Sequence, residues 1–202
     1  MKNVLITGGC GFIGSSFVQL IIAHSDFHPV VLDKLTYAGN LDNLNMHDKD
    51  EYTFIKGDIC DELLVSKLFE KYKFNAVFHF AAESHVDRSI DGPKEFIQSN
   101  IIGTFTLLQT SLQNKKNLGD DFKFIHVSTD EVYGDLNDGE YFKETTPYAP
   151  NSPYSASKAA SDHLVRAWGK TFGLPTIITN CSNNYGPYPV SYTHLRAHET
   201  RH

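Results

Sequence analysis

The chain has 202 residues, of which 41% are hydrophobic and 21% are charged, and its formal net charge at pH 7 is -6. These values are typical of a globular domain with a sizeable core. The charge is spread along the sequence, which argues against a nucleic-acid or anionic-membrane partner. The three cysteines lie far apart, in no spacing typical of a disulfide framework or a zinc site, so we expect no metal. Because no signal peptide or membrane span is recognisable, we also expect a cytoplasmic location.

Six short apolar runs alternate with longer, helix-like stretches along the chain. They span residues 4–7, 30–33, 52–55, 76–80, 122–127 and 176–179. Runs that are apolar throughout are typical of strands buried on both faces, and the segments between them are long enough for crossover helices. The alternation predicts an α/β fold with a doubly wound parallel sheet, the Rossmann fold.

Helices are expected over 61–72, from Pro93 past Leu108, and after Pro153. Asp61 is the expected N-cap of the first of them. Residues 134–150, rich in Asp, Gly, Thr and Pro, form the one long irregular stretch. Loops of this length are often functional.

Glycines recur at every third position where the first predicted strand gives way to a helix, in the segment Gly8-Gly9-Cys10-Gly11-Phe12-Ile13-Gly14. Without side chains the backbone can approach a pyrophosphate, which the first amides and the dipole of the helix would hold. An isolated motif of this kind can also be no more than a tight turn. Asp33 favours the dinucleotide, because it ends the second predicted strand about 20 residues further on, where an acid binds the adenosine ribose.

The charge of Asp33 would repel a 2′-phosphate, so we expect NAD rather than NADP, although the neighbouring Lys34 weakens this inference. The segments after the third and fourth strands lie where loops of such a sheet close over a dinucleotide, though each could be an ordinary strand-end turn. The predicted cofactor contacts are Gly8, Gly11, Phe12, Ile13, Gly14, Asp33, Lys34, Asp58, Ile59, Ala81, Ala82, Glu83 and Ser84.

A phenol and an ammonium group follow at helical spacing. Tyr154 and Lys158 are four residues apart, which puts them on one face of the helix after Pro153. A nearby lysine is expected to lower the pKa of the phenol, so that Tyr154 can act as base for a substrate hydroxyl. Such pairs also occur on solvated helix faces.

Two acids, Asp130 and Glu131, follow the fifth predicted strand directly after Ser128 and Thr129. The carboxyl end of a strand faces the crevice where open sheets bind ligands, so the two hydroxyls can hold a substrate oxygen. The two carboxyl groups can provide a general acid and a general base. The alternative is a pair of solvated carboxylates at a turn.

Together these segments resemble the extended short-chain dehydrogenase/reductases, and within them the dTDP-glucose 4,6-dehydratase family, from residue 1 to residue 189. The motifs that carry the resemblance are TGGCGFIG, DKLTYAGN, AAESHVDRSI, STDEVYGD, SPYSASKAASDHLVRAW and NCSNNYGPY.

The resemblance implies dehydration of dTDP-glucose to the 4-keto-6-deoxy sugar, in which NAD takes a hydride from C4 and returns it to C6. Tyr154, tuned by Lys158, would be the base for the C4 hydroxyl, which Thr129 also engages. Glu131 would remove the C5 proton, and Asp130 would protonate the departing C6 hydroxyl. Further implied contacts are Ser84, Thr129 and Asn183 to the substrate, and Leu35, Thr36, Ser99, Tyr154, Lys158 and Asn184 to NAD.

The acid pair separates this family from similar ones. Epimerases of similar sequence usually have small residues at both positions, whereas GDP-mannose dehydratases and UDP-glucuronate decarboxylases tend to keep the glutamate alone. An NAD-dependent nucleotide-sugar epimerase or decarboxylase and a non-catalytic NAD-binding module are the alternatives. Family members commonly dimerise through helices equivalent to those near Pro93 and Pro153, so a homodimer is expected by analogy.

After Tyr188 the sequence departs from the family pattern. Residues 190–202 read VSYTHLRAHETRH, which looks like a translated adaptor, and we expect this tail to be an artefact. We expect residues 1–189 to form the NAD-binding Rossmann domain and the substrate domain to be truncated. His194, His198 and His202 recur at helical spacing, but no acid is placed to orient them, so no metal site is expected.

Overall fold

The computed structural model describes residues 2–48, 50–119, 121–137 and 139–186. Six parallel strands form one sheet in the order β3-β2-β1-β4-β5-β6. The strands are β1 (Lys2–Thr7), β2 (Phe27–Asp33), β3 (Thr53–Lys56), β4 (Ala76–His79), β5 (Lys123–Thr129) and β6 (Thr176–Cys181). Each strand overlaps a predicted apolar run, and the order is that of the Rossmann fold, so the predicted fold class is confirmed.

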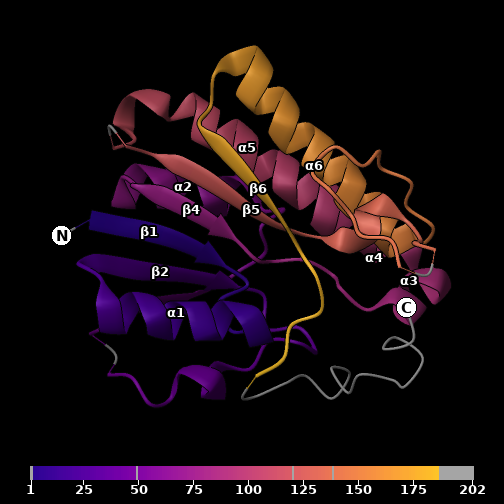
Figure 1. The fold of residues 1–202 in the computed structure, drawn as a ribbon. Helices are drawn as coiled ribbons and strands as arrows, with labels where there is room; N and C mark the ends of the chain where they lie inside the picture. Colours follow the sequence, from indigo (N-terminus) through magenta and orange to yellow (C-terminus); the bar gives the residue numbers. More distant parts are fainter. Residues whose placement is uncertain (1, 49, 120, 138, 187–202) are drawn as a thin grey trace.

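Helices cover both faces of the sheet (Figure 1). On one face of the sheet, Val4 and Ile6 of β1 belong to a core cluster that includes Val18. On the other face, Leu5 of the same strand belongs to a separate core cluster. A strand that is buried on both faces has no polar side to present, which explains the continuous apolar runs. The first face carries α1 (Phe12–His24), and the second carries α2 (Glu62–Tyr72), α5 (Thr104–Gln113) and α6 (Pro153–Phe172).

Side-chain caps fix where two of these helices begin. Asp61 accepts a hydrogen bond from the amide of Leu64, which confirms it as the N-cap of α2. At the start of α6, Ser152 accepts from the amide of Ser155, and the Ser155 hydroxyl accepts in return from the amide of Ser152 at 2.9 Å. This capping box satisfies amides that helix geometry leaves without partners.

The helical stretch that begins at Pro93 is continuous but irregular. It starts as α4 (Pro93–Phe96), widens to π-helical turns over Ile97–Gly103, and continues as α5. Such a widening changes which side chains face the core, and it buries Asn100. The short helix α3 (Val86–Asp91) precedes it.

The carboxyl ends of β1 and β4 lie next to each other where the strand order reverses, and open α/β sheets bind ligands at this switch point. The described residues of the long loop 134–150 run beside α6 (Figure 1), where the ring of Tyr148 lies 5.3 Å from that of His163. In the described part of the chain, no helix combines the length and apolar character that a membrane span requires, and no group of three or more histidine, cysteine or acidic residues could hold a metal ion. The expected tail, residues 190–202, lies outside the described residues.

Candidate active site

The turn between β1 and α1 brings backbone close to backbone. Gly8 has a φ of +70°, and a Cβ there would lie 2.6 Å from the amide nitrogen of Ala81. A Cβ on Gly14 would collide with the carbonyl oxygen of Gly8. Gly11 caps α1 without a side-chain hydrogen bond, so the first amides of the helix are not occupied by a capping side chain. Such amides suit a pyrophosphate.

Asp33 is buried at the end of β2, where backbone amides hold its carboxylate. Its Oδ2 accepts a hydrogen bond from the amide of Cys10 at 2.9 Å, and its Oδ1 accepts from the amide of Leu35 at 2.8 Å. Lys34 turns to Asp58 instead, with its Nζ 2.8 Å from the Asp58 Oδ2. Because this ion pair neutralises Lys34, the Lys34 charge is less available to bind the 2′-phosphate of NADP.

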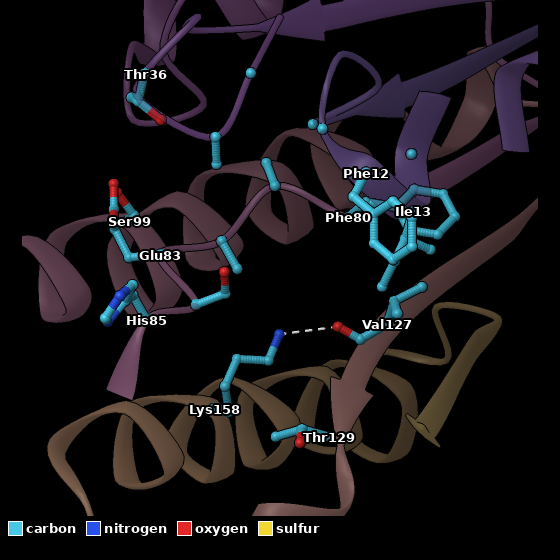
Figure 2. A pocket seen from close by; sticks show the side chains of 18 of the residues that line it. Phe12, Ile13, Thr36, Phe80, Glu83, His85, Ser99, Val127, Thr129 and Lys158 are labelled. Atoms are coloured by element: carbon cyan, nitrogen blue, oxygen red, sulfur yellow. Dashed lines mark hydrogen bonds between the residues drawn. The ribbon is translucent and has the colours of Figure 1, made fainter. Parts of the chain in front are cut away.

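A cavity of about 330 Å³ opens at these strand ends. Its volume is in the range of small-molecule sites. Figure 2 shows Phe12, Ile13 and Phe80 together at one end and Ser99, Glu83 and His85 at the other, with Lys158 pointing between them. The predicted residues that line it are Gly8, Gly11, Phe12, Ile13, Gly14, Asp33, Lys34, Thr36, Asp58, Ile59, Ala81, Ala82, Glu83, Ser84, Ser99, Thr129, Glu131, Tyr154, Lys158, Asn183 and Asn184.

Two predicted residues do not line the cavity. The side chain of Leu35 packs against the core cluster on the α1 face, so its contribution near the site is its amide, which binds Asp33. Asp130 begins a short 3-10 helix, η4 (Asp130–Tyr133), and of the two adjacent acids the cavity reaches Glu131. The tight turn of η4 points neighbouring side chains in different directions.

Several lining residues were not among the predicted contacts. Tyr37, Ala38 and Gly39 continue the segment that begins at Asp33, and the guanidinium of Arg88 lies 3.8 Å from the centre of the Tyr37 ring. Tyr37, Ala38 and Gly39 directly follow predicted cofactor contacts in the sequence, and this adjacency could have identified them. The others are Leu32, Gly57, Phe80, His85, Val86, Val127, Cys181 and Ser182. Ser128, expected from the sequence to hold a substrate oxygen, also lines the cavity.

Asn100 supports the site without lining it. Its Oδ1 accepts from the amide of Glu83 at 2.8 Å, and its Nδ2 donates to the carbonyl of Glu83 at 3.0 Å and to the hydroxyl of Ser157 at 2.8 Å. The π-helical turns therefore tie the loop after β4 to the helix that carries the predicted catalytic pair. The sequence gives no sign of this, since the partners are far apart along the chain.

Lys158 and Tyr154 are both buried at the floor of the cavity. The Lys158 Nζ donates to the carbonyl of Val127 at 2.9 Å, the dashed line in Figure 2. Burial lowers the pKa of Lys158 to about 8, against the opposing charge of Asp162. Burial and the charge of Glu131 raise the pKa of Tyr154, and the hydrogen bond from Thr129 only partly offsets them. The expectation that the phenol has a lowered pKa is therefore wrong for this state of the site.

The two adjacent acids, Asp130 and Glu131, have different surroundings. Burial raises the pKa of Asp130, although a hydrogen bond from the hydroxyl of Thr129, 3.4 Å away, opposes the rise. A raised pKa favours the protonated form, as a proton donor requires. Glu131 faces the cavity floor beside Tyr154.

The fold and this cavity define an α/β protein of the Rossmann class with a glycine-rich first turn and a buried tyrosine–lysine pair. The chain belongs to the family described as GDP-mannose 4,6 dehydratase, whose model matches residues 5–196. Among individual proteins it is similar to the dTDP-glucose 4,6-dehydratases of Salmonella typhimurium, at 55% identity over 200 residues, and of Neisseria meningitidis, at 56% over 194. The matches cover 92% and 93% of this chain, but the chain spans only 55% of the length of each relative.

Solved structures of dehydratases and epimerases share the fold of this chain. A dTDP-glucose 4,6-dehydratase from Streptomyces venezuelae with NAD bound superposes with a TM-score of 0.85 at 47% identity, covering 93% of this chain and 58% of that one. A UDP-glucose 4-epimerase from Thermus thermophilus in complex with NAD gives 0.83 at 33% identity, covering 93% and 57%. The fold is thus shared with epimerases, whereas the higher sequence identity is with the dehydratase.

Proposed function

We propose that this chain is the cofactor-binding and catalytic part of an NAD-dependent enzyme that dehydrates dTDP-glucose to dTDP-4-keto-6-deoxyglucose. The observation that carries the proposal is the meeting of Glu131, Thr129, Tyr154 and Lys158 at one end of a cavity whose other walls are the glycine-rich turn and Asp33. The similarity to dTDP-glucose 4,6-dehydratases supports the choice of substrate.

The described residues fit NAD. The first turn of α1 offers amides without a capping side chain, and the carboxylate of Asp33 stands at the end of β2 for the ribose hydroxyls. Ser99 and Asn184 line the same cavity and would contact the cofactor. When bound, NAD would supply reversible hydride transfer with the sugar.

The chain's own groups would move the protons. Tyr154 would accept the proton of the C4 hydroxyl, with Lys158 providing the positive charge that stabilises the phenolate and Thr129 holding the same oxygen. Glu131 would take the proton from C5. Asp130, whose pKa is raised by burial, would donate to the C6 hydroxyl as it leaves as water. Because Asp130 does not line the cavity, its side chain would have to rotate to reach the sugar. Ser84 and Asn183, which do line the cavity, would hold the sugar.

The decisive experiment mixes dTDP-glucose with this chain and with a version extended by the carboxyl-terminal part that its relatives carry. A 4-keto-6-deoxy product without net NADH supports the proposal. A C4-epimerised sugar would indicate an epimerase, loss of carbon dioxide from a uronate substrate would indicate a decarboxylase, and NAD binding without turnover by either version would indicate a binding module.

We also propose that the chain forms a homodimer and acts in the cytoplasm. On the helices near Pro93, Ile97 is 52% exposed and Ile102 is 40% exposed, which offers apolar surface for a second copy. The cysteines of the described residues are free, as suits a reducing compartment. Sedimentation equilibrium tests the first point, and Ile97→Lys should shift a dimer toward monomer.

A further inference from the structure

A buried carboxylate lies next to the proposed catalytic pair without a part in the proton transfers above. Asp162 is 1% exposed and follows Lys158 by one turn of α6, so the two side chains lie on the same face of the helix. A carboxylate at this depth is costly unless hydrogen bonds and an opposite charge compensate it.

Three side chains donate hydrogen bonds to Oδ2 of Asp162. They are the hydroxyl of Ser128 at 2.9 Å, the phenol of Tyr148 at 3.0 Å and the amide of Asn180 at 3.4 Å. These donors come from the end of β5, the loop before α6 and the end of β6. Burial raises the pKa of Asp162, while the charge of Lys158 and these three donors oppose the rise.

The other oxygen, Oδ1, is buried beside His126. It lies 3.2 Å from the Nε2 of His126, yet it makes no hydrogen bond there. Burial and the charge of Lys158 keep the pKa of His126 well below its usual value, so the ring is neutral. A neutral imidazole offers no counter-charge, whereas the Lys158 Nζ lies 3.5 Å from the same Nε2, so the two charged groups lie on either side of one ring nitrogen.

The contacts of Lys158 also support its pairing with Asp162. Its Nζ donates to the carbonyl of Val127 and lies 3.5 Å from the Nε2 of His126, and neither group carries a full charge. The charge of Asp162 is the larger of the two influences that raise the Lys158 pKa, and Cys181 is the smaller. The titratable groups around Lys158 are His79 from β4, His126 from β5, Glu131 from η4, Cys181 from β6, and Tyr154 and Asp162 from α6.

We propose that Asp162 is a positioning residue: its carboxylate is the counter-charge that keeps Lys158 protonated, and its hydrogen bonds tie the ends of β5 and β6 to α6. Asn180 extends the second role, because its amide also donates to the carbonyl of Thr129 at 3.2 Å. The consequence for catalysis rests on the proposed function, in which Tyr154 acts as a base only beside a charged Lys158. The pairing itself does not depend on that function.

The test is an NMR titration of this chain without substrate, with lysine labelled at Cε. The Lys158 signal is the one that Lys158→Arg removes. Asp162→Asn keeps the shape of the side chain and removes its charge, so the Lys158 pKa should fall by at least about one pH unit. Asp162→Glu restores the charge and should recover most of that shift. Glu70→Gln removes one exposed charge from α2 and should leave Lys158 unchanged.

An unchanged Lys158 pKa in folded Asp162→Asn would overturn the proposal. If that variant does not fold, the unmutated chain decides, because the Asp162 Cγ signal must shift as Lys158 loses its proton, and a flat Cγ signal refutes the pairing. Neither measurement needs turnover, so a failed dehydratase assay does not affect it. In an active extended chain, Asp162→Asn should also move the alkaline limb of kcat/KM to lower pH, which lost packing alone does not do.

Discussion

At the scale of single residues, Asp33 has both a recognition role and a structural one. Its carboxylate carries the charge expected to repel a 2′-phosphate, and it also holds the amides of Cys10 and Leu35. Asp33→Asn keeps one acceptor oxygen and removes the charge, so it should narrow the preference for NAD over NADP about tenfold. Asp33→Ala should weaken both cofactors, because the loop loses its anchor. Calorimetric titration measures both, and equal affinities in the unmutated chain would contradict the role.

Lys158 sets an expected pH dependence. A lysine that must be charged supports activity fully below its pKa, and that support is lost as the pH rises through it. Burial lowers this pKa to about 8, so in an extended, active chain kcat/KM should decline around pH 8. A profile from pH 6 to 11 that stays level until pH 10 would show that the charge of Lys158 is not required, or that its pKa is not lowered.

The acids after β5 separate dehydration from simple hydride transfer. In an extended chain, Asp130→Asn and Glu131→Gln should each spare the oxidation at C4, which depends on Tyr154 and Lys158. NADH absorbance should then accumulate on mixing with dTDP-glucose while product forms at least about a hundredfold more slowly. Tyr154→Phe is the matched control, and it should give neither NADH nor product. Normal turnover by both acid variants would refute the assigned mechanism.

At the scale of elements, the β1–α1 turn depends on missing side chains. A Cβ on Gly14 would meet the carbonyl of Gly8, and backbone cannot move aside as a flexible side chain can. Gly14→Ala should therefore lower the free energy of unfolding by about 1–3 kcal/mol and abolish NAD binding. Gly92→Ala is the control, since its Cβ would make only an ordinary contact at 3.7 Å and its φ is -140°. Urea unfolding and NAD titration compare the two, and equal effects would contradict the role of the turn.

The elements differ in how far the sequence predicts them. The six strands were predictable from their short apolar runs, which in the central strands β1 and β2 are buried on both faces. The starts of α2 and α6 were predictable from Asp61 and Pro153. The π-helical turns around Asn100 were not predicted, because no residue pattern within residues 97–103 indicates them. They form where Asn100 binds Glu83 and Ser157, which are brought together only by the tertiary fold.

At the scale of the whole molecule, the sequence predicted which residues at the strand ends form the site. It did not predict the properties of those residues that depend on burial. Fold topology gathers the carboxyl ends of parallel strands, so motifs on separate loops meet in one cavity. The pKa of Tyr154 and the pairing of Lys158 with Asp162 depend on burial and on side chains from three other segments. Spacing along one helix indicates proximity but carries no information on the surrounding dielectric.

Stabilisation by each ligand shows how much of the site this chain holds. Nearly all predicted cofactor contacts line the cavity, whereas the chain spans 55% of the length of its relatives. A ligand that binds the native state stabilises it by mass action, so NAD at one hundred times its Kd should raise the free energy of unfolding by about 2.7 kcal/mol.

For dTDP-glucose, whose predicted contacts here are few, we expect a smaller rise at equal concentration. Thermal unfolding with each ligand, alone and together, makes the comparison. In Gly14→Ala the response to NAD should disappear, because the amides of the first turn no longer approach a pyrophosphate. A chain that gains stability from dTDP-glucose but none from NAD would show that the cavity at the end of β1 holds the substrate rather than the cofactor.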